Sequence, residues 1–198
     1  MRNLKNFILQ SWLLIVAAFV CGLLLAMTNS ALDPIIKKNE MGEMYDKMKK
    51  LIPQAETFEV VIPKAEIAGN ETDVYQALDA NKKSLGFSFV GTGSGFQDKI
   101  KLVIAVNNDA NKLLGFDVLF SNETPGFGSR MTEDWFMKQF VGAPTGQLTL
   151  VKTGNTEEKN EQIVAITGAT VTSTAVVNIF NNHIAKLKEL LKEKGLIK

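Results

Sequence analysis

The sequence predicts an α+β protein with one apolar helix at its N-terminus, followed by a domain with an antiparallel sheet and a long C-terminal helix. Three observations support this prediction. Residues 7–27 carry no charge, and residues 58–120 alternate short apolar runs with polar turns. From Val177 to Leu191, apolar side chains recur every three or four positions, which is typical of a helix packed on a core. With 45% hydrophobic and 22% charged side chains, the 198 residues suffice for one domain of ordinary size.

The uncharged stretch from Phe7 to Met27 predicts a helix that crosses the cell membrane. Twenty-one helical residues reach roughly 31 Å, which matches a hydrocarbon core of roughly 30 Å. A cleaved signal peptide is the alternative, but this run is longer than the usual hydrophobic region of such a peptide. Arg2 and Lys5 precede the helix, so we expect a single-pass protein with its N-terminus in the cytoplasm and its following domain on the outer face.

Turn signals and periodicity predict the remaining elements. Asp33 and Pro34 suit the N-cap and first residue of a juxtamembrane helix, which Pro53 ends. Polar turns at residues 79–83 and 107–111 separate the strands of an antiparallel meander. We expect strands at 58–62, 74–78, 85–90, 99–106 and 113–120, a short helix with Trp135, Phe136 and Phe140 on one face, strands near 148–151 and 163–166, and a final long helix. The predicted divisions are a tail and anchor at 1–32, a juxtamembrane helix at 33–55 and an extracytoplasmic domain at 56–198.

The composition excludes several classes of function. With 22 basic and 21 acidic side chains and no dense basic cluster, the chain is not expected to bind nucleic acid. Its single cysteine and single histidine exclude an internal disulfide, a four-cysteine cluster and a multi-histidine metal site, so no metal site is predicted. Any redox chemistry therefore requires a cofactor. We interpret His183 as a surface histidine.

Two features near the middle of the chain receive structural interpretations. Gly91-Thr92-Gly93-Ser94-Gly95 is similar to a dinucleotide-binding loop, but a strand follows where such a loop needs a helix. We interpret it as a flexible strand connection, and the adjacent Phe96 as a core residue, with ligand covering as the alternative. Glu133 and Asp134 are interpreted as charges that complement the start of a helix, and no catalytic residue is predicted.

Two further segments suit ligand binding. In Glu123-Thr124-Pro125-Gly126-Phe127-Gly128, the proline restricts one dihedral and the glycines allow close backbone approach, so a flat ligand can lie against it. A tight corner is an equally good interpretation. Thr167-Gly168-Ala169-Thr170-Val171-Thr172-Ser173 joins a strand to the final helix, where free amides and the helix dipole favour a phosphate. Simple capping of the helix by Thr170 or Thr172 is the alternative.

Together these segments resemble the FMN-binding domain shared by the G subunit of the Rnf complex and the C subunit of the sodium-pumping NADH:quinone reductase. The resemblance covers nearly the whole chain, including the anchor and Gly95-Phe96-Gln97-Asp98-Lys99-Ile100, and its length is similar to that of the Rnf G subunit. It implies that FMN is joined through its phosphate to the hydroxyl of Thr170. It also implies contacts to FMN from Thr167, Gly168, Ala169, Val171 and Thr172, and from Glu123, Thr124, Pro125, Gly126, Phe127 and Gly128.

One position departs from the family motif. An aspartate commonly lies six residues before the modified threonine, where this sequence has Val164. Thr172, Ser173 and Thr174 are weaker alternatives for the attachment. Lys152 and Arg130 are candidate cations for the phosphate or for tuning the flavin.

The resemblance further implies a covalent flavoprotein subunit that relays electrons within an Rnf-type ion-translocating ferredoxin:NAD oxidoreductase complex. No complete active site is expected on this chain alone. The expected partners are the membrane and redox subunits of that complex, a flavin transferase and the lipid bilayer. The alternatives are a membrane-anchored ligand-binding or scaffold module without redox function and, less favoured, a threonine-nucleophile enzyme, which needs a base that the sequence does not identify.

Overall fold

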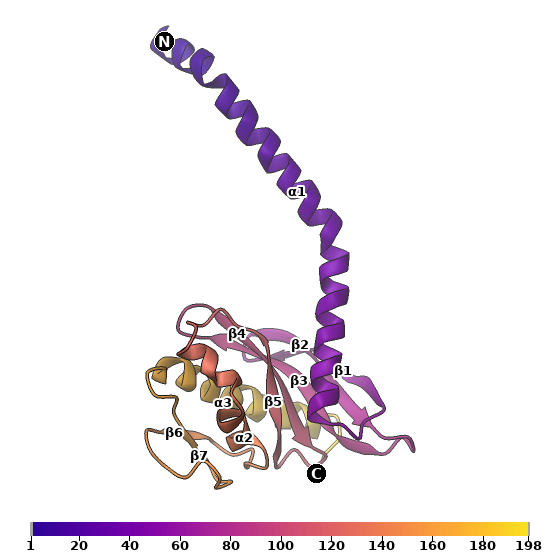
Figure 1. Ribbon diagram of the computed structural model, residues 1–198. Coiled ribbons are helices and arrows are strands. Elements are labelled where there is room, and N and C mark those ends of the chain that lie inside the picture. The colour runs from indigo at the N-terminus through magenta and orange to yellow at the C-terminus, as the bar shows by residue number, and fades with distance from the viewer. Residues whose placement is uncertain (1, 198) are drawn as a thin grey trace. The chain divides into compact units, whose positions relative to one another are not determined.

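The computed structural model describes residues 2–197, and it describes side chains from Ser11 onward (Figure 1). Contacts divide the chain into two compact units, Met1–Gly42 and Glu43–Lys198. The helices are α1 (Arg2–Leu51), α2 (Asp134–Phe140) and α3 (Thr170–Glu193), with a 3-10 helix η1 (Gly128–Thr132). The strands are β1 (Thr57–Ile67), β2 (Asn70–Leu78), β3 (Ser84–Ser94), β4 (Lys99–Asn107), β5 (Leu113–Phe120), β6 (Thr149–Val151) and β7 (Gln162–Val164).

Helix α1 is continuous, so the prediction that a separate helix begins at Asp33 is wrong. Pro34 lies inside α1, where its lack of a backbone N–H removes one helical hydrogen bond. Asp33 pairs with Lys37 at 2.7 Å instead of capping a new helix. The part from Ser11 to Leu51 is long and apolar enough to cross a membrane, judged by length and composition. As predicted, the helix ends just before Pro53.

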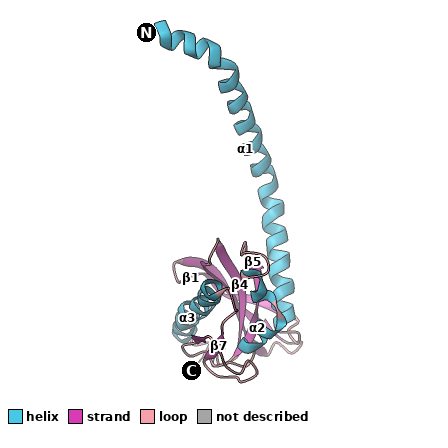
Figure 2. Ribbon diagram, turned by 60° about the vertical axis from the view of Figure 1, so that its left-hand side comes forward, coloured by secondary structure: helices cyan, strands magenta, loops and turns pink. Residues whose placement is uncertain are grey.

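The second unit contains an antiparallel five-stranded sheet in which sequence neighbours pair throughout, in the order β1-β2-β3-β4-β5. This is the predicted meander, and the polar turns at 79–83 and 107–111 connect its strands. Strands β6 and β7 form a separate parallel pair. Figure 2 shows α3 alongside the sheet, as expected for this α+β arrangement.

The glycine-rich segment is part of a strand, so its interpretation as a flexible connection is wrong. Gly91 and Gly93 belong to β3 and pair with Leu102 and Ile100 of β4. A Cβ atom on Gly91 would lie 2.8 Å from Ile179 Cγ2, and one on Gly93 would lie 2.5 Å from Ile179 Cγ1. The glycines therefore permit α3 to approach the strand closely.

The two faces of the sheet contribute to different hydrophobic clusters. Along β4, Leu102 and Ile104 belong to the main core with α3, whereas the intervening Val103 packs with Met44 and Met48 near the end of α1. The main core also includes a group of phenylalanines, in which the ring of Phe140 lies 4.9 Å from that of Phe116 and 4.6 Å from that of Phe180. The C-terminal end of α1 therefore covers one face of the sheet, and α3 covers the other.

An ion-pair cluster joins the end of α1 to β5. Asp117 accepts hydrogen bonds from Lys47 Nζ at 3.2 Å and Lys50 Nζ at 2.7 Å. Burial alone would raise the pKa of Asp117, but the bonds from Lys50 and Lys47 outweigh burial and hold that pKa below its usual value. The carboxylate is therefore ionised and couples the helix to the sheet.

Asp117→Asn is expected to lower the free energy of unfolding of the second unit by about 1–2 kcal/mol, because two lysines lose a largely buried anionic partner. Denaturant titration of the full-length chain in detergent, monitored by tryptophan fluorescence, measures this change. Asp134→Asn removes the exposed pair with Lys138 and should cost less than about 0.5 kcal/mol. Equal effects of the two substitutions would contradict the coupling.

Candidate functional site

A pocket of about 480 Å³ lies where the β3–β4 turn, the loop after β5 and the start of α3 meet. This volume is in the range of small-molecule sites, about 300–1,000 Å³. The two segments predicted to bind a ligand contribute most of its lining, although they are distant in sequence. The lining residues are Phe96, Thr124, Phe127, Gly128, Gly168, Ala169, Thr170, Val171 and Thr172.

Four predicted site residues, Thr167, Glu123, Pro125 and Gly126, are not among the lining residues. Thr167 is exposed beside the pocket segment, whereas Glu123 is buried. Gly126 has a φ of +75°, and the Phe127 amide donates to the Thr124 carbonyl oxygen at 3.2 Å. The loop is thus a tight corner, and it also forms a wall of the pocket. Ligand binding by this loop stays a prediction.

Thr170 is the first residue of α3, and its side chain is exposed within the pocket. Its hydroxyl makes no hydrogen bond to any described residue, and neither do the backbone amides of Thr170, Val171 and Thr172. The first turn of the helix contains no acidic residue. A free hydroxyl therefore lies beside unpaired amides at the positive end of a long helix, an environment that favours a phosphate.

The neighbouring hydroxyls are in different environments. Thr172 is buried and donates to Glu123, so it does not cap the helix. Ser173 is also buried; it donates to the Ala169 carbonyl at 2.9 Å and accepts from the Ile166 amide at 3.0 Å. Thr174 is exposed, but it donates to the Thr170 carbonyl at 2.8 Å and does not line the pocket. Among residues 170–174, only Thr170 presents an unbonded hydroxyl to the pocket.

Two aromatic side chains provide planar surfaces at the pocket. Phe96 is 67% exposed, so its assignment to the core is wrong and the ligand-covering alternative agrees with its position. The Gly95 amide donates to the Asp98 carbonyl at 2.8 Å and closes a tight turn that directs Phe96 outward. Phe127 is 54% exposed, and a Cβ atom on Gly168 would lie 3.1 Å from its ring. Aromatic faces of this kind stack well on a flat heterocycle.

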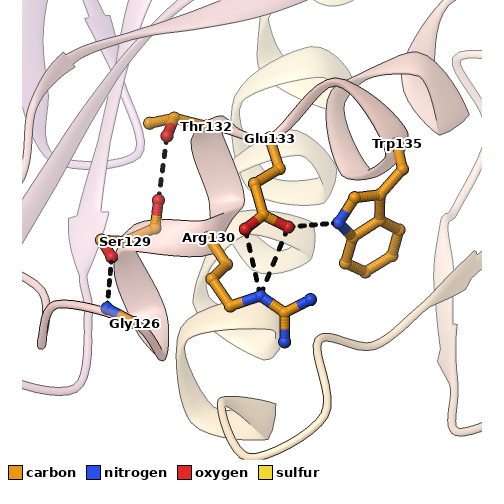
Figure 3. Close-up of polar contacts among 6 residues, drawn as sticks. All are labelled: Gly126, Ser129, Arg130, Thr132, Glu133 and Trp135. Atoms are coloured by element: carbon orange, nitrogen blue, oxygen red, sulfur yellow. Dashed lines mark hydrogen bonds and ion pairs between the residues drawn. The ribbon is translucent and has the colours of Figure 1, made fainter.

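The candidate cations do not line this pocket. Arg130 pairs with Glu133, which also accepts from the Trp135 indole N–H (Figure 3). The Trp135 hydrogen bond, followed by the Arg130 bond, lowers the pKa of Glu133. Lys152 is exposed elsewhere. Glu133 directly precedes α2 and Asp134 lies in its first turn, which confirms their interpretation as charges at a helix start.

The position that departs from the family motif lies in β7. The Val164 amide donates to Gln139 Oε1 at 2.7 Å, and Gln139 Nε2 donates to the Val164 carbonyl at 3.3 Å. Gln139 is buried, so its amide group ties α2 to the strand that leads to the Thr170 segment. Within the described residues, no group of three His, Cys, Asp or Glu side chains is placed to hold a metal ion.

His183 is 1% exposed, so its interpretation as a surface residue is wrong. Its Nε2 atom accepts from the Thr92 amide at 3.1 Å, which leaves Nδ1 as the donor to the Ile179 carbonyl at 2.8 Å. Burial lowers the pKa of His183, so the ring is neutral. The sequence contained a usable signal, since His183 follows Phe180 by three residues and precedes Leu187 by four on the apolar stripe.

The buried His183 predicts acid sensitivity. The pKa of His183 is lower in the folded than in the unfolded state. Its contribution to the free energy of unfolding is therefore fully present above the unfolded pKa of 6.5 and is lost as the pH falls below that value. Between about pH 7.5 and about pH 5.5, this group should reduce the free energy of unfolding by up to about 1.4 kcal/mol. Denaturant titrations at both pH values test this, with His183→Gln as the non-titrating control. Equal pH dependence of the two proteins would contradict it.

Comparisons with known proteins agree with this geometry. A family model for the FMN-binding domain matches residues 95–185, a range that contains every residue lining the pocket. The G subunit of the ion-translocating oxidoreductase complex of Methanosarcina acetivorans is 30% identical over 179 residues, covering 86% of this chain and 89% of that protein. The chain belongs to this family of G subunits. The G subunit of the proton-translocating ferredoxin:NAD(+) oxidoreductase complex of Clostridium ljungdahlii is 29% identical and covers 82% of each chain.

The fold of this G-type subunit is also similar to that of a solved relative. NqrC of Shewanella oneidensis superimposes with a TM-score of 0.56 at 25% identity, covering 71% of this chain and 73% of that one. The predicted family resemblance and fold class are therefore confirmed. The residue that carries FMN, and the covalent nature of its attachment, stay predictions.

Proposed function

We propose that this chain is a membrane-anchored flavoprotein subunit that relays electrons within an Rnf-type ion-translocating ferredoxin:NAD oxidoreductase complex, with FMN attached covalently to Thr170. One observation carries the proposal: two distant family segments and an aromatic turn meet at one pocket, where Thr170 presents an unbonded hydroxyl. The related G subunits support a place in a redox complex.

The residues of the pocket suit both ends of FMN. The unpaired amides of α3 and the Thr170 hydroxyl suit the phosphate, and the rings of Phe96 and Phe127 suit the isoalloxazine. When bound, FMN supplies the electron-transfer chemistry, while the protein positions it and tunes its reduction potential. An exposed helix N-terminus contributes only about 0.3–1 kcal/mol to anion binding, which supports a covalent bond as the means of retaining the cofactor.

The attachment requires an activated flavin nucleotide, such as FAD. The Thr170 oxygen forms a bond to the phosphorus nearest the flavin, the bond from that phosphorus to AMP breaks, and the hydroxyl proton passes to a base. No carboxylate or imidazole contacts the Thr170 hydroxyl among the described residues. A separate flavin transferase that supplies this base is therefore part of the proposal.

The proposed location follows from α1 and the charges before it. Residues 11–51 include a segment able to cross a membrane, and Arg2 and Lys5 favour a cytoplasmic N-terminus. The FMN-bearing domain then lies on the outer face, where its partners are the membrane and redox subunits of the complex. Residues 7–27 contain no ionisable side chain other than Cys21, so the ion path is assigned to those other subunits.

Mass spectrometry of the full-length chain from its native host tests this function. The expected peptide covering residues 163–185 carries one FMN phosphoester on Thr170, and the denatured protein remains fluorescent. Flavin that dissociates on denaturation would overturn covalent attachment while retaining FMN binding. A chain with neither modification nor bound flavin would support the anchored scaffold instead.

A further inference from the structure

We propose that Glu123 is a positioning residue, whose carboxylate holds the three walls of the FMN pocket in register. The inference rests on the proposed function, because it concerns the same site. It assigns Glu123 a role through Gln97 and Thr172, in place of direct contact with the flavin.

The two carboxylate oxygens of Glu123 bond to different walls. Oε1 accepts from the Gln97 backbone amide at 3.0 Å, and Oε2 accepts from the Thr172 hydroxyl. Gln97 directly follows Phe96 in the β3–β4 turn, and Thr172 lies two residues after Thr170 in α3. Glu123 itself precedes Thr124 in the third wall. One side chain therefore connects the aromatic surface, the loop and the helix that bears the attachment hydroxyl.

The surrounding backbone is shaped to accommodate this carboxylate. Gly95 lies so close to Glu123 Oε1 that a side chain on residue 95 would collide with it, and a Cβ atom on Gly128 would lie 2.8 Å from Oε2. Glu123 is only 6% exposed, and no lysine or arginine pairs with it among the described residues. Both of its buried oxygens are instead satisfied by hydrogen bonds from the pocket walls, so losing either partner would leave a buried polar group unpaired.

Other side-chain links between these walls are longer. Thr124 Oγ1 donates to Gln97 Oε1 at 3.4 Å, and Asn122 Nδ2 donates to Asp98 Oδ2 at 3.3 Å. Both distances exceed those of ordinary strong side-chain hydrogen bonds, and both pairs are exposed. The Glu123 carboxylate thus provides the main polar connection that relates Phe96 to Thr170.

The test uses Glu123→Gln in the full-length chain, with Glu133→Gln as the matched control. Glu133 also accepts hydrogen bonds from two other residues, but these are Arg130 and Trp135, and neither of them lines the pocket. With flavin transferase and FAD, we expect FMN transfer to Glu123→Gln to slow about tenfold or more, because the amide has one accepting oxygen and leaves one buried donor unpaired. The fluorescence anisotropy of the attached flavin should also fall. Glu133→Gln should match the wild type in both measurements.

Thr172→Val breaks the same connection from the other end and should change rate and anisotropy in the same direction. Thr172→Ser retains the donor and should restore most of both signals. If Glu123→Gln does not fold, the transfer rate and anisotropy of Thr172→Val test the inference without it. A lower melting temperature with wild-type rate and anisotropy would make Glu123 merely structural and overturn the inference. A wild-type chain that accepts no flavin would overturn the proposed function as well, so the two failures are distinguishable.

Discussion

Thr170→Ala should yield a folded protein that carries no covalent flavin. The hydroxyl is the proposed bonding atom, so its removal eliminates attachment completely. Because this hydroxyl is exposed and bonds to no described residue, its loss should change the free energy of unfolding by less than about 0.5 kcal/mol. In-gel fluorescence and intact mass report the flavin, and denaturant titration reports the fold.

Two controls make the Thr170 result specific. Thr174→Ala removes an exposed hydroxyl one helical turn later and should leave flavin attachment complete. Thr170→Ser keeps a hydroxyl on the same backbone atom and should retain attachment, although at a different rate. A fluorescent Thr170→Ala chain would place the flavin on another residue, and peptide mapping would identify it.

Gly93→Ala should destabilise the domain by about 1–3 kcal/mol, the usual cost of forcing extra volume into a packed core. The new methyl group would lie 2.5 Å from Ile179 Cγ1, so α3 or β3 must shift. Because Thr170 begins the same helix, this shift should also slow FMN transfer. Denaturant titration and the transfer assay measure the two effects.

Ile179→Ala provides the matched test of that explanation. It removes the colliding atoms, so the Gly93→Ala/Ile179→Ala protein should be more stable than the sum of the single effects predicts. Gly42→Ala is the control for adding a methyl group without a collision, since a Cβ atom there meets nothing within 4 Å. Alanine is more favourable than glycine in a helix by about 1 kcal/mol, so this substitution should not destabilise the protein. Additive effects of Gly93→Ala and Ile179→Ala would contradict the collision.

Local patterns were sufficient to predict most of the fold. Alternating apolar runs and polar turns identified the five strands of the meander, because side chains in a strand alternate between its faces. Periodicity identified α3, and an uncharged run identified the candidate membrane segment in α1. Local patterns wrongly predicted that a new helix begins at Asp33. An Asp-Pro pair is typical of a helix start, but here it lies in the interior of the continuous helix α1.

The environment of each site residue depended on contacts between distant segments. The surface prediction for His183 failed because this residue lies on the apolar stripe of α3, a signal that the sequence does carry. Its acceptor role toward the Thr92 amide, in contrast, exists only once α3 packs on β3. The core prediction for Phe96 failed because the turn at Gly95 and Asp98 directs the ring outward. The prediction of a flexible connection at Gly91 and Gly93 failed because nothing local in the sequence indicates that Ile179 lies against them.

The family motifs in the sequence were enough to place this chain among FMN-binding subunits, because such motifs are local features. The same resemblance implies Thr170 as the attachment residue, which stays a prediction. The resemblance left Thr172, Ser173 and Thr174 as weaker alternatives for the attachment. Folding distinguishes them: Glu123 and the Ile166–Ala169 backbone occupy the hydroxyls of Thr172 and Ser173, while that of Thr170 faces the pocket. Accessibility and hydrogen-bond partners are properties of packed segments, so they arise only when the loop, the turn and the helix come together.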